Sequence, residues 1–156
     1  MPWTYGKSLL TTTAIVAVFL CASTARGVGG VAFVHTYSNG DVGIEGIGGP
    51  RALAMSPDGA TLYVSSVSSD DGPTIGVFQR DAATGRLSQV QVVHPDFCTG
   101  ILPGSISVSP DGGNVYVTGG SCDTLNVYER DSLSGALTFF EVHQQGVGGV
   151  DGIDGA

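Results

Sequence analysis

Charged side chains are scarce in this sequence, and cations are scarcer than anions. Only 13% of the 156 residues are charged, with six Lys plus Arg against fourteen Asp plus Glu. Low charge together with 42% hydrophobic residues argues against an intrinsically disordered chain. The shortage of cations excludes a basic face for nucleic acid, and the length is that of one ordinary domain.

The sequence also lacks an apolar run long enough for a spanning helix, which needs about 20 residues. Residues 9–20 are mostly apolar, Lys7 precedes them, and the small residues Ser23 and Ala25 follow. This order is typical of a secretory signal peptide, here residues 1–25 with cleavage after Ala25. It predicts a secreted, periplasmic or cell-surface protein without a membrane span after cleavage; a permanent anchor is the alternative.

Motifs for catalysis and for cofactors are missing as well. There is no G-x-S-x-G elbow, and His35, His94 and His143 are isolated from one another. Of the three, only His94, in a connection between predicted blades, is a candidate for a functional role. The glycine-rich string at 146–155 has no helix to follow it and lacks the EF-hand spacing. The sequence therefore predicts no catalytic, cofactor-binding or metal-binding residue and no cofactor.

What the chain does contain is an internal repeat. The turn sequence SPDG occurs at 56–59 and again at 109–112, an offset of 53 residues, and Tyr-Val follows each copy at the same spacing. Further on, VFQRD (77–81) matches VYERD (127–131) at an offset of 50. The motif GIEGIGGP (43–50) then aligns with GVDGIDGA (149–156) at 106, twice 53. Because the offset falls from 53 to 50 residues and later returns to a multiple of 53, the matches indicate a true repeat.

Each repeat resolves into four short strands. The first alternates small and large residues, the second and third are rich in β-branched and aromatic residues, and the fourth is polar at alternate positions. Four antiparallel strands repeated at about 50 residues are typical of a β-propeller blade. We expect an all-β partial propeller over 26–156. Its parts are an outer strand at about 31–37, blade one at about 51–93, blade two at about 104–143, and a linker at 144–156.

These motifs resemble a known family. SPDG, then YVSS or YVTG, then VFQRD or VYERD, then TGRL or SGAL, are similar to the YVTN-type repeats of seven-bladed lactonase-like propellers. The resemblance covers about residues 31–156. It implies enzymes that open sugar lactones, such as that of 6-phosphogluconate, or that cyclise carboxymuconate; many other members carry only the repeats.

Two blades leave two blade faces bare, because a propeller needs about four to eight blades to close. Residues 31–40 match 137–146, so the propeller part begins in the last strand of a further blade. The chain therefore reads as a fragment of a longer propeller. Further blades or self-association are expected to cover the bare faces.

The acidic residues are predicted to gather at one end of the blades, where they serve solubility or bind a cation or a basic partner. Arg51 lies nearby, whereas Arg80, Arg86 and Arg130 lie at the opposite end with the turns. Asp151 and Asp154 are the candidates for a weak cation site. The full set is Asp41, Glu45, Asp70, Asp71, Asp96, Asp123, Asp151 and Asp154.

An anionic lactone would require Arg, Lys or His at its site, and this end offers almost none. The sequence therefore favours a secreted interaction or structural module whose protein or small-molecule ligand is unknown. The alternative is part of a lactonase-like enzyme acting on a sugar lactone or a carboxymuconate-type substrate. A fragment without function is the third reading.

Two cysteines follow the predicted cleavage site, and export favours a disulfide between them. Cys98 lies in the connection entering blade two, and Cys122 lies in the connection between the second and third strands of that blade. Both connections belong to the same end of the blade, which predicts a Cys98–Cys122 bridge; two free thiols are the alternative.

Overall fold

The computed structural model describes residues 15–20, 32–95, 103–120 and 122–154, and every regular element among them is a strand. In the described part of the chain, no helix is long and apolar enough to cross a membrane. The strands are β1 (Ile15–Leu20), β2 (Ala32–Ser38), β3 (Pro50–Met55), β4 (Thr61–Ser68), β5 (Gly72–Arg80), β6 (Leu87–Val93), β7 (Pro103–Val108), β8 (Asn114–Gly119), β9 (Thr124–Arg130) and β10 (Leu137–Gln144).

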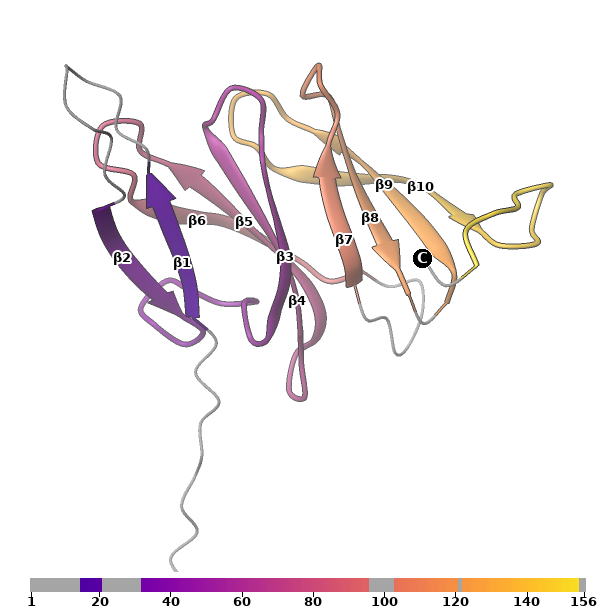
Figure 1. Cartoon of the computed structure of the whole chain (residues 1–156), viewed down its shortest axis with the longest axis horizontal. Helices are drawn as coiled ribbons and strands as arrows, with labels where there is room; N and C mark the ends of the chain where they lie inside the picture. Colours follow the sequence, from indigo (N-terminus) through magenta and orange to yellow (C-terminus); the bar gives the residue numbers. More distant parts are fainter. Residues whose placement is uncertain (1–14, 21–31, 96–102, 121, 155–156) are drawn as a thin grey trace, which may run out of the picture.

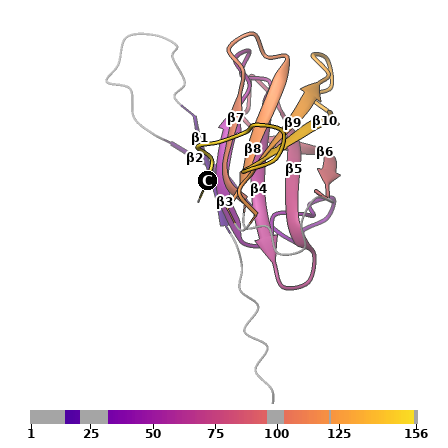
Figure 2. The ribbon, with the colours of Figure 1, turned by 90° about the vertical axis from the view of Figure 1, so that its right-hand side faces the viewer.

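These strands form two four-stranded antiparallel sheets, which confirms the predicted propeller blades. Blade one has the order β3-β4-β5-β6, and blade two has the order β7-β8-β9-β10. The two sheets stand side by side in Figure 1, and the view turned by 90° shows one in front of the other (Figure 2). Each blade is a plain meander, so strands that follow one another in sequence are also neighbours in the sheet.

The repeated turns have the same hydrogen bonds in both blades. In the first SPDG turn, Oδ1 of Asp58 accepts a bond from the amide of Ala60 at 2.9 Å and from Oγ of Ser56 at 2.5 Å. In the second turn, Oδ1 of Asp111 accepts the equivalent bonds from Gly113 and Ser109. The aspartate thus replaces a backbone acceptor in the turn, and SPDG recurs because each blade needs this hairpin.

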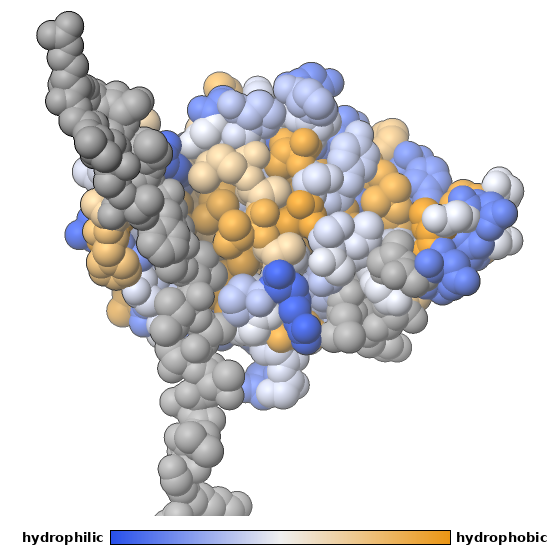
Figure 3. Space-filling view, in the orientation of Figure 1, coloured by the Kyte–Doolittle hydropathy of each residue, from blue (hydrophilic) through white to orange (hydrophobic). Residues whose placement is uncertain are grey.

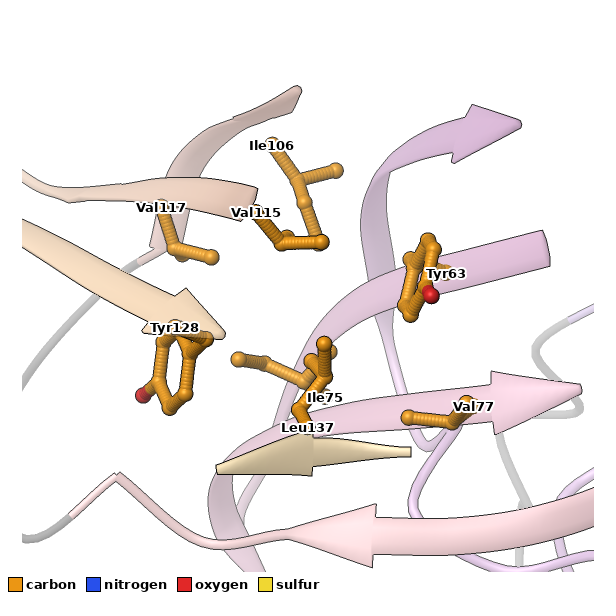
Figure 4. Close-up of a cluster of buried hydrophobic side chains, with 8 residues drawn as sticks. All are labelled: Tyr63, Ile75, Val77, Ile106, Val115, Val117, Tyr128 and Leu137. Carbon is orange, nitrogen blue, oxygen red and sulfur yellow. The ribbon is translucent and has the colours of Figure 1, made fainter. Parts of the chain in front are cut away.

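Two separate clusters of buried side chains form the core. One fills the space between the blades, with members from β4, β5, β7, β8, β9 and β10 (Figure 4). Its buried residues are Tyr63, Ile75, Val77, Ile106, Val115, Val117, Tyr128 and Leu137. The other cluster lies on the opposite face of blade one, where Tyr37, Ile44 and Ile47 cover Leu62, Val64 and Phe78. Blade one is therefore buried on both faces, which explains the continuous burial of Thr61–Ser66 along β4.

β2 is the predicted outer strand of a further blade, and β1 pairs with it antiparallel. β1 falls within the apolar run that the sequence analysis assigned to the signal peptide. A short apolar run rich in β-branched residues fits a signal core and a buried strand equally well. The signal peptide stays a prediction, and it competes with β1 for the same residues.

Candidate functional site

The candidate site lies at the start of the inner strands β3 and β7, which are the edge strands that border the central channel of a propeller. We call this end of the blades, with the β4–β5 and β8–β9 connections and the links between blades, the loop end. The opposite end, with the SPDG turns, is the turn end. β3 and β7 lie next to each other across the blade interface.

Both inner strands carry an irregularity at the loop end. Pairing with β4 shifts between Pro50 and Ala52, so Arg51 is the extra residue of a bulge. Pairing of β7 with β8 shifts between Pro103 and Ile106, at the equivalent place. Bulges re-aim a side chain and recur beside active sites. Arg51 is exposed there, so the bulge presents a guanidinium at the loop end of the inner strand β3.

Blade two places small polar groups where blade one has Arg51. Gly104 stands at the position of Arg51, and the amide of Ser105 donates to Oγ1 of Thr118 at 2.9 Å. The hydroxyls of Ser105 in β7 and Thr118 in β8 lie 3.2 Å apart at the loop end of blade two. Among the described residues, Arg51 is the only arginine or lysine at the loop end. The other three arginines, Arg80, Arg86 and Arg130, lie at the turn end.

The acidic residues of the loop end do not converge on one point in the described parts of the chain. Oδ2 of Asp41 accepts the amide of Ser38, and Oδ1 of Asp151 accepts Nε2 of Gln145 at 2.7 Å. The hydrogen bond from Gln145 lowers the pKa of Asp151. Over the described ranges, no group of three or more His, Cys, Asp or Glu is placed to hold a metal. A cation site at Asp151 and Asp154 stays a prediction, and Asp96 lies outside the described residues.

The three histidines are separate in the structure as they are in the sequence. His35 stacks edge-on against Tyr37 in β2, with ring centroids 4.7 Å apart, and Nε2 of His143 lies 3.0 Å from Glu141 in β10. His94 is exposed just beyond β6, the outer strand of blade one. Since β3 and β6 are opposite edges of the same sheet, His94 is not beside Arg51.

Cys122 lies in the β8–β9 connection at the loop end and takes part in a disulfide. Cys98 lies outside the described residues. The pairing of Cys98 with Cys122 therefore stays a prediction, and it concerns the connection that leads into β7.

The turn end holds a hydrogen-bond network that sequence analysis missed. Arg130, at the end of β9, reaches across the blade interface to blade one. Its Nε donates to the Tyr63 hydroxyl at 2.9 Å, and its Nη2 donates to Oδ2 of Asp58 at 3.0 Å and to Oγ1 of Thr61 at 3.2 Å. Its Nη1 donates to the Gly112 carbonyl of its own blade at 3.3 Å. The side chain is only 3% exposed, so this cation is a buried strut between blades.

The protonation states of the network fit these bonds. Burial raises the pKa of Tyr63, so the phenol stays protonated and donates to the Gly135 carbonyl at 2.8 Å. Burial lowers the pKa of Arg130, but the hydrogen bonds and charges of Asp58 and Tyr63 together outweigh burial, so the pKa is raised. The signal in the sequence was the pair Arg80 and Arg130 at matching repeat positions, which sequence analysis interpreted only as part of a turn.

Acid is expected to weaken this network through Asp58. The hydrogen bonds from Ser56 and Ala60, with a smaller effect of Arg130, lower the pKa of Asp58 from 3.8 to about 2. A lowered carboxyl pKa stabilises the fold above pH 3.8 and ceases to do so as the pH falls through about 2. Because Asp58 is 47% exposed, we expect a contribution of only about 0.5–1 kcal/mol. Urea unfolding at pH 5 and pH 2 should show a smaller loss of stability in Asp58→Asn than in the wild type; equal losses would contradict this.

Comparison with known proteins identifies the repeat. A family model described as "Lactonase, 7-bladed beta-propeller" matches residues 15–150. The chain belongs to this family. Two blades and part of a third, out of seven, make up about a third of such a propeller.

Individual relatives also match this chain over about a third of their own length. A curated 6-phosphogluconolactonase of Bacillus subtilis is 33% identical over 96 residues, which are 60% of this chain and 27% of the relative. The solved structure of the periplasmic gluconolactonase of Pseudomonas aeruginosa is 28% identical, with a TM-score of 0.65 over 86% of this chain and 35% of that protein. A solved structure from Bacteroides fragilis, 23% identical, shares the fold with a TM-score of 0.65 over 84% of this chain and 33% of its own. The chain thus spans about a third of the length of these relatives.

These relatives correct the functional hypothesis. The sequence analysis favoured a module without catalysis, and that hypothesis is wrong, because the relatives of this chain are named as lactonases. The reason for the error is physical: the anion-binding groups were sought across the whole loop end. The acids dominate that end as a whole, whereas the inner strand β3 carries the exposed Arg51 there.

Proposed function

We propose that this chain forms part of a lactonase-type propeller that hydrolyses a sugar lactone in the mouth of its central channel. Membership of the lactonase family supports the fold of the site, and the named relatives support the substrate class. The observation that carries the proposal is Arg51, an exposed cation on a bulge at the channel end of an inner strand. The carboxymuconate-type reaction has no comparable support among these relatives.

The chemistry of the substrate explains why one arginine at this place matters. A lactone is a cyclic ester, and its hydrolysis adds water to the carbonyl carbon and releases a sugar acid. When the sugar carries a phosphate, a guanidinium can bind that group with two parallel hydrogen bonds. Such a clamp fixes the sugar ring relative to the water that attacks it, and positioning of this kind makes a large contribution to catalysis. We assign this positioning role to Arg51.

The surroundings of Arg51 favour a ligand over a structural partner. Arg130 shows what a structural arginine looks like in this chain, with four hydrogen bonds and almost no exposure. Arg51 is exposed, and no hydrogen bond or ion pair to its side chain is present among the described residues. The counterpart of Arg51 in β7, which lies next to β3, is Gly104, so blade two places no second large side chain at this repeat position.

Loss of Arg51 is expected to weaken the binding of a phosphorylated sugar acid. In Arg51→Ala, the Kd for 6-phosphogluconate, measured by titration calorimetry, should rise about tenfold or more, because charge-assisted hydrogen bonds are lost. Arg51→Lys should recover only part of the affinity, since lysine offers a point charge without the planar fork. Gluconate, which lacks the phosphate, should bind equally weakly to all three proteins.

The matched control is Arg86→Ala, which removes an exposed arginine from the turn end and should leave 6-phosphogluconate binding unchanged. The hydrolysis of 6-phosphogluconolactone in a pH-stat provides the second readout. Equal affinity of the wild type and Arg51→Ala for 6-phosphogluconate, or equal loss in Arg86→Ala, would contradict the assignment of Arg51.

The proposal includes export. The predicted signal sequence at residues 1–25 and the periplasmic gluconolactonase among the relatives both support a location outside the cytoplasm. A disulfide at Cys122 agrees with such a compartment, because disulfides persist in oxidising environments.

A further inference from the structure

The two blades differ at the loop end, where blade one has the longer hairpin. The repeat offset falls from 53 to 50 residues across the β4–β5 connection, so blade one has three residues more there than blade two. In blade two, the pairing of β8 with β9 ends at Gly119, the residue that also pairs with Pro103 at the start of β7. In blade one, β4 pairs with β5 beyond Ser66, through Val67 and Ser68. The insertion therefore extends the paired strands of the hairpin.

The longer hairpin projects beyond the inner strand that carries Arg51. Pro50, the first residue of β3, pairs with Ser66, and β4 continues for two more residues, about 7 Å at the usual rise of a strand. Figure 1 shows the β4–β5 connection extending away from the body of the molecule, and in Figure 3 its tip is white to blue, the hydrophilic half of the scale. Insertions in one copy of a repeat often lie on the binding face. The hairpin is therefore a candidate wall of the site at Arg51.

Close contacts fix this hairpin against the segment that leads to Arg51. The Val67 amide donates to the Gly49 carbonyl at 3.1 Å. A Cβ at Gly48 would lie 2.8 Å from Cβ of Ser68, so the hairpin can lie this close only because residue 48 is a glycine. The Ser68 side chain thus faces the segment, and it identifies the side of the hairpin that is turned toward the segment.

Asp71 lies on that same side of the hairpin. Its amide donates to Oγ of Ser68 at 2.9 Å, and its Oδ2 accepts a longer bond from the same hydroxyl at 3.4 Å. Asp71 is exposed, and its Oδ1 has no hydrogen-bond partner in the part of the chain that the structure describes. The neighbouring Asp70 instead accepts the hydroxyl of Ser69 at 2.9 Å. One exposed carboxylate therefore stands beside the segment of Arg51 with an oxygen free to accept.

A buried hydroxyl without a partner lies at the base of the hairpin. Ser66 is fully buried, and its Oγ makes no hydrogen bond with any described group. Ser66 pairs with Pro50, across the ladder from the bulge at Arg51. An unpaired buried polar group in a native fold indicates a bound water or ion, or a functional role. This corner of blade one is therefore a place that a further polar molecule completes.

We propose that Asp71 makes the site at Arg51 selective for polyhydroxylated anions, an assignment that rests on the proposed function. Arg51 binds the phosphate of the substrate, and Oδ1 of Asp71 accepts hydrogen bonds from the hydroxyl groups of the sugar chain. A carboxylate suits this role, because hydroxyl groups are donors and bonds to a charged acceptor are stronger than neutral ones. The same carboxylate repels an anion that has no hydroxyl groups. Asp71 is thus a specificity-determining residue that contacts the substrate.

The test compares two ligands that share the phosphate. 6-Phosphogluconate carries hydroxyl groups along its chain, whereas methyl phosphate carries none, and each is titrated into the full-length protein by calorimetry. In Asp71→Ala, the preference for 6-phosphogluconate over methyl phosphate, given by the ratio of the two Kd values, should fall about tenfold, because a charge-assisted bond is lost. Asp71→Asn should recover part of the preference, since its amide oxygen still accepts.

Two further variants separate the contact from a general effect of charge. Asp70→Ala removes the same charge from the same hairpin and should leave the preference unchanged. A variant without Ser69, Asp70 and Asp71, which shortens the connection to the length found in blade two, should lose the preference as Asp71→Ala does. Circular dichroism verifies that each variant is folded.

The outcomes distinguish this assignment from the proposed function. An unchanged preference in Asp71→Ala, or an equal fall in Asp70→Ala, would overturn the role of Asp71 alone when Arg51→Ala still weakens the binding of 6-phosphogluconate. Failure of the proposed function looks different: the wild type would not bind 6-phosphogluconate, or Arg51→Ala would bind it equally well. Either of these results would overturn both.

Discussion

Replacing Arg130 by methionine is expected to lower the free energy of unfolding by about 2–4 kcal/mol, because it breaks a buried network of charge-assisted hydrogen bonds. Methionine preserves much of the apolar stem, so the loss reports on the guanidinium. The groups that lose their partner are the Tyr63 hydroxyl, Asp58, Thr61 and the Gly112 carbonyl. Of these, only Asp58 is exposed enough to regain water easily.

The two other arginines of the turn end provide graded controls for this experiment. Arg80→Met should cost less than Arg130→Met, because Arg80 makes one described hydrogen bond, to Gly59, instead of four. Arg86→Met should change stability by no more than about 0.5 kcal/mol, as is usual for an exposed position. Urea unfolding followed by circular dichroism measures all three. Equal effects of Arg130→Met and Arg86→Met would show that the strut does not hold the blades together.

Tyr63→Phe is the second single variant of a double-mutant cycle with Arg130→Met. The Tyr63 hydroxyl accepts from Arg130 and donates to Gly135, so the change should cost about 1–2 kcal/mol. If both residues act through one network, the double variant should lose clearly less than the sum of the two single losses.

The repeat made most of the fold predictable. SPDG and the R-D-x-x-T/S-G motif fix the two turns of each blade, and the number of strands between them follows from the apolar runs. The outer strand was expected at about 31–37 and is β2 at Ala32–Ser38. Local turn chemistry and strand periodicity are properties of short segments, which is why a sequence reveals them.

Contacts between blades were harder to predict, because they join residues that no local pattern connects. Arg130 and Tyr63 are 67 residues apart, and the sequence shows only that each has a counterpart in the other repeat. The bulge at Arg51 was equally hidden, since it depends on a shift in the pairing of β3 with β4. A repeated polar residue at the end of an apolar strand is the one signal that points to such a contact.

The first strand shows a further limit of sequence patterns. An apolar run flanked by Lys7 and small residues is typical of a signal peptide, yet residues 15–20 pair with β2 over five positions. Hydrophobicity and β-branching are common to both uses of the segment. Determining the amino-terminal residue of the exported protein distinguishes them, because cleavage after Ala25 would remove β1.

The candidate site and the turn end divide the arginines of the chain by use. Arg130 binds groups of both blades, Arg80 donates one described side-chain hydrogen bond to its own blade, and Arg51 stands on a bulge of β3 at the loop end. The proposed role of Arg51 therefore rests on its place on the inner strand, and the acids of the loop end contribute to the same electrostatic potential.

Gly49→Ala is expected to lower the free energy of unfolding by about 3–5 kcal/mol, because the added methyl group would overlap main chain. Gly49 has a φ of +79°, and a Cβ there would lie 2.3 Å from the Val67 carbonyl oxygen. The neighbouring main chain cannot give way cheaply, since the Val67 amide donates to the Gly49 carbonyl at 3.1 Å.

Gly59→Ala is the matched control, because Gly59 has a similar φ of +68° but an open surrounding with nothing within 4 Å of the added atom. It should lose only the conformational cost of the left-handed region, about 1–2 kcal/mol. Thermal and urea unfolding of the two variants separate the steric part from the conformational part. Since Gly49 precedes Pro50 and the bulged Arg51, a shift of β3 should also weaken 6-phosphogluconate binding in Gly49→Ala and spare it in Gly59→Ala. Equal losses of stability in the two variants would mean that the start of β3 adapts to the methyl group, and that the close approach of Gly49 to Val67 is not what positions Arg51.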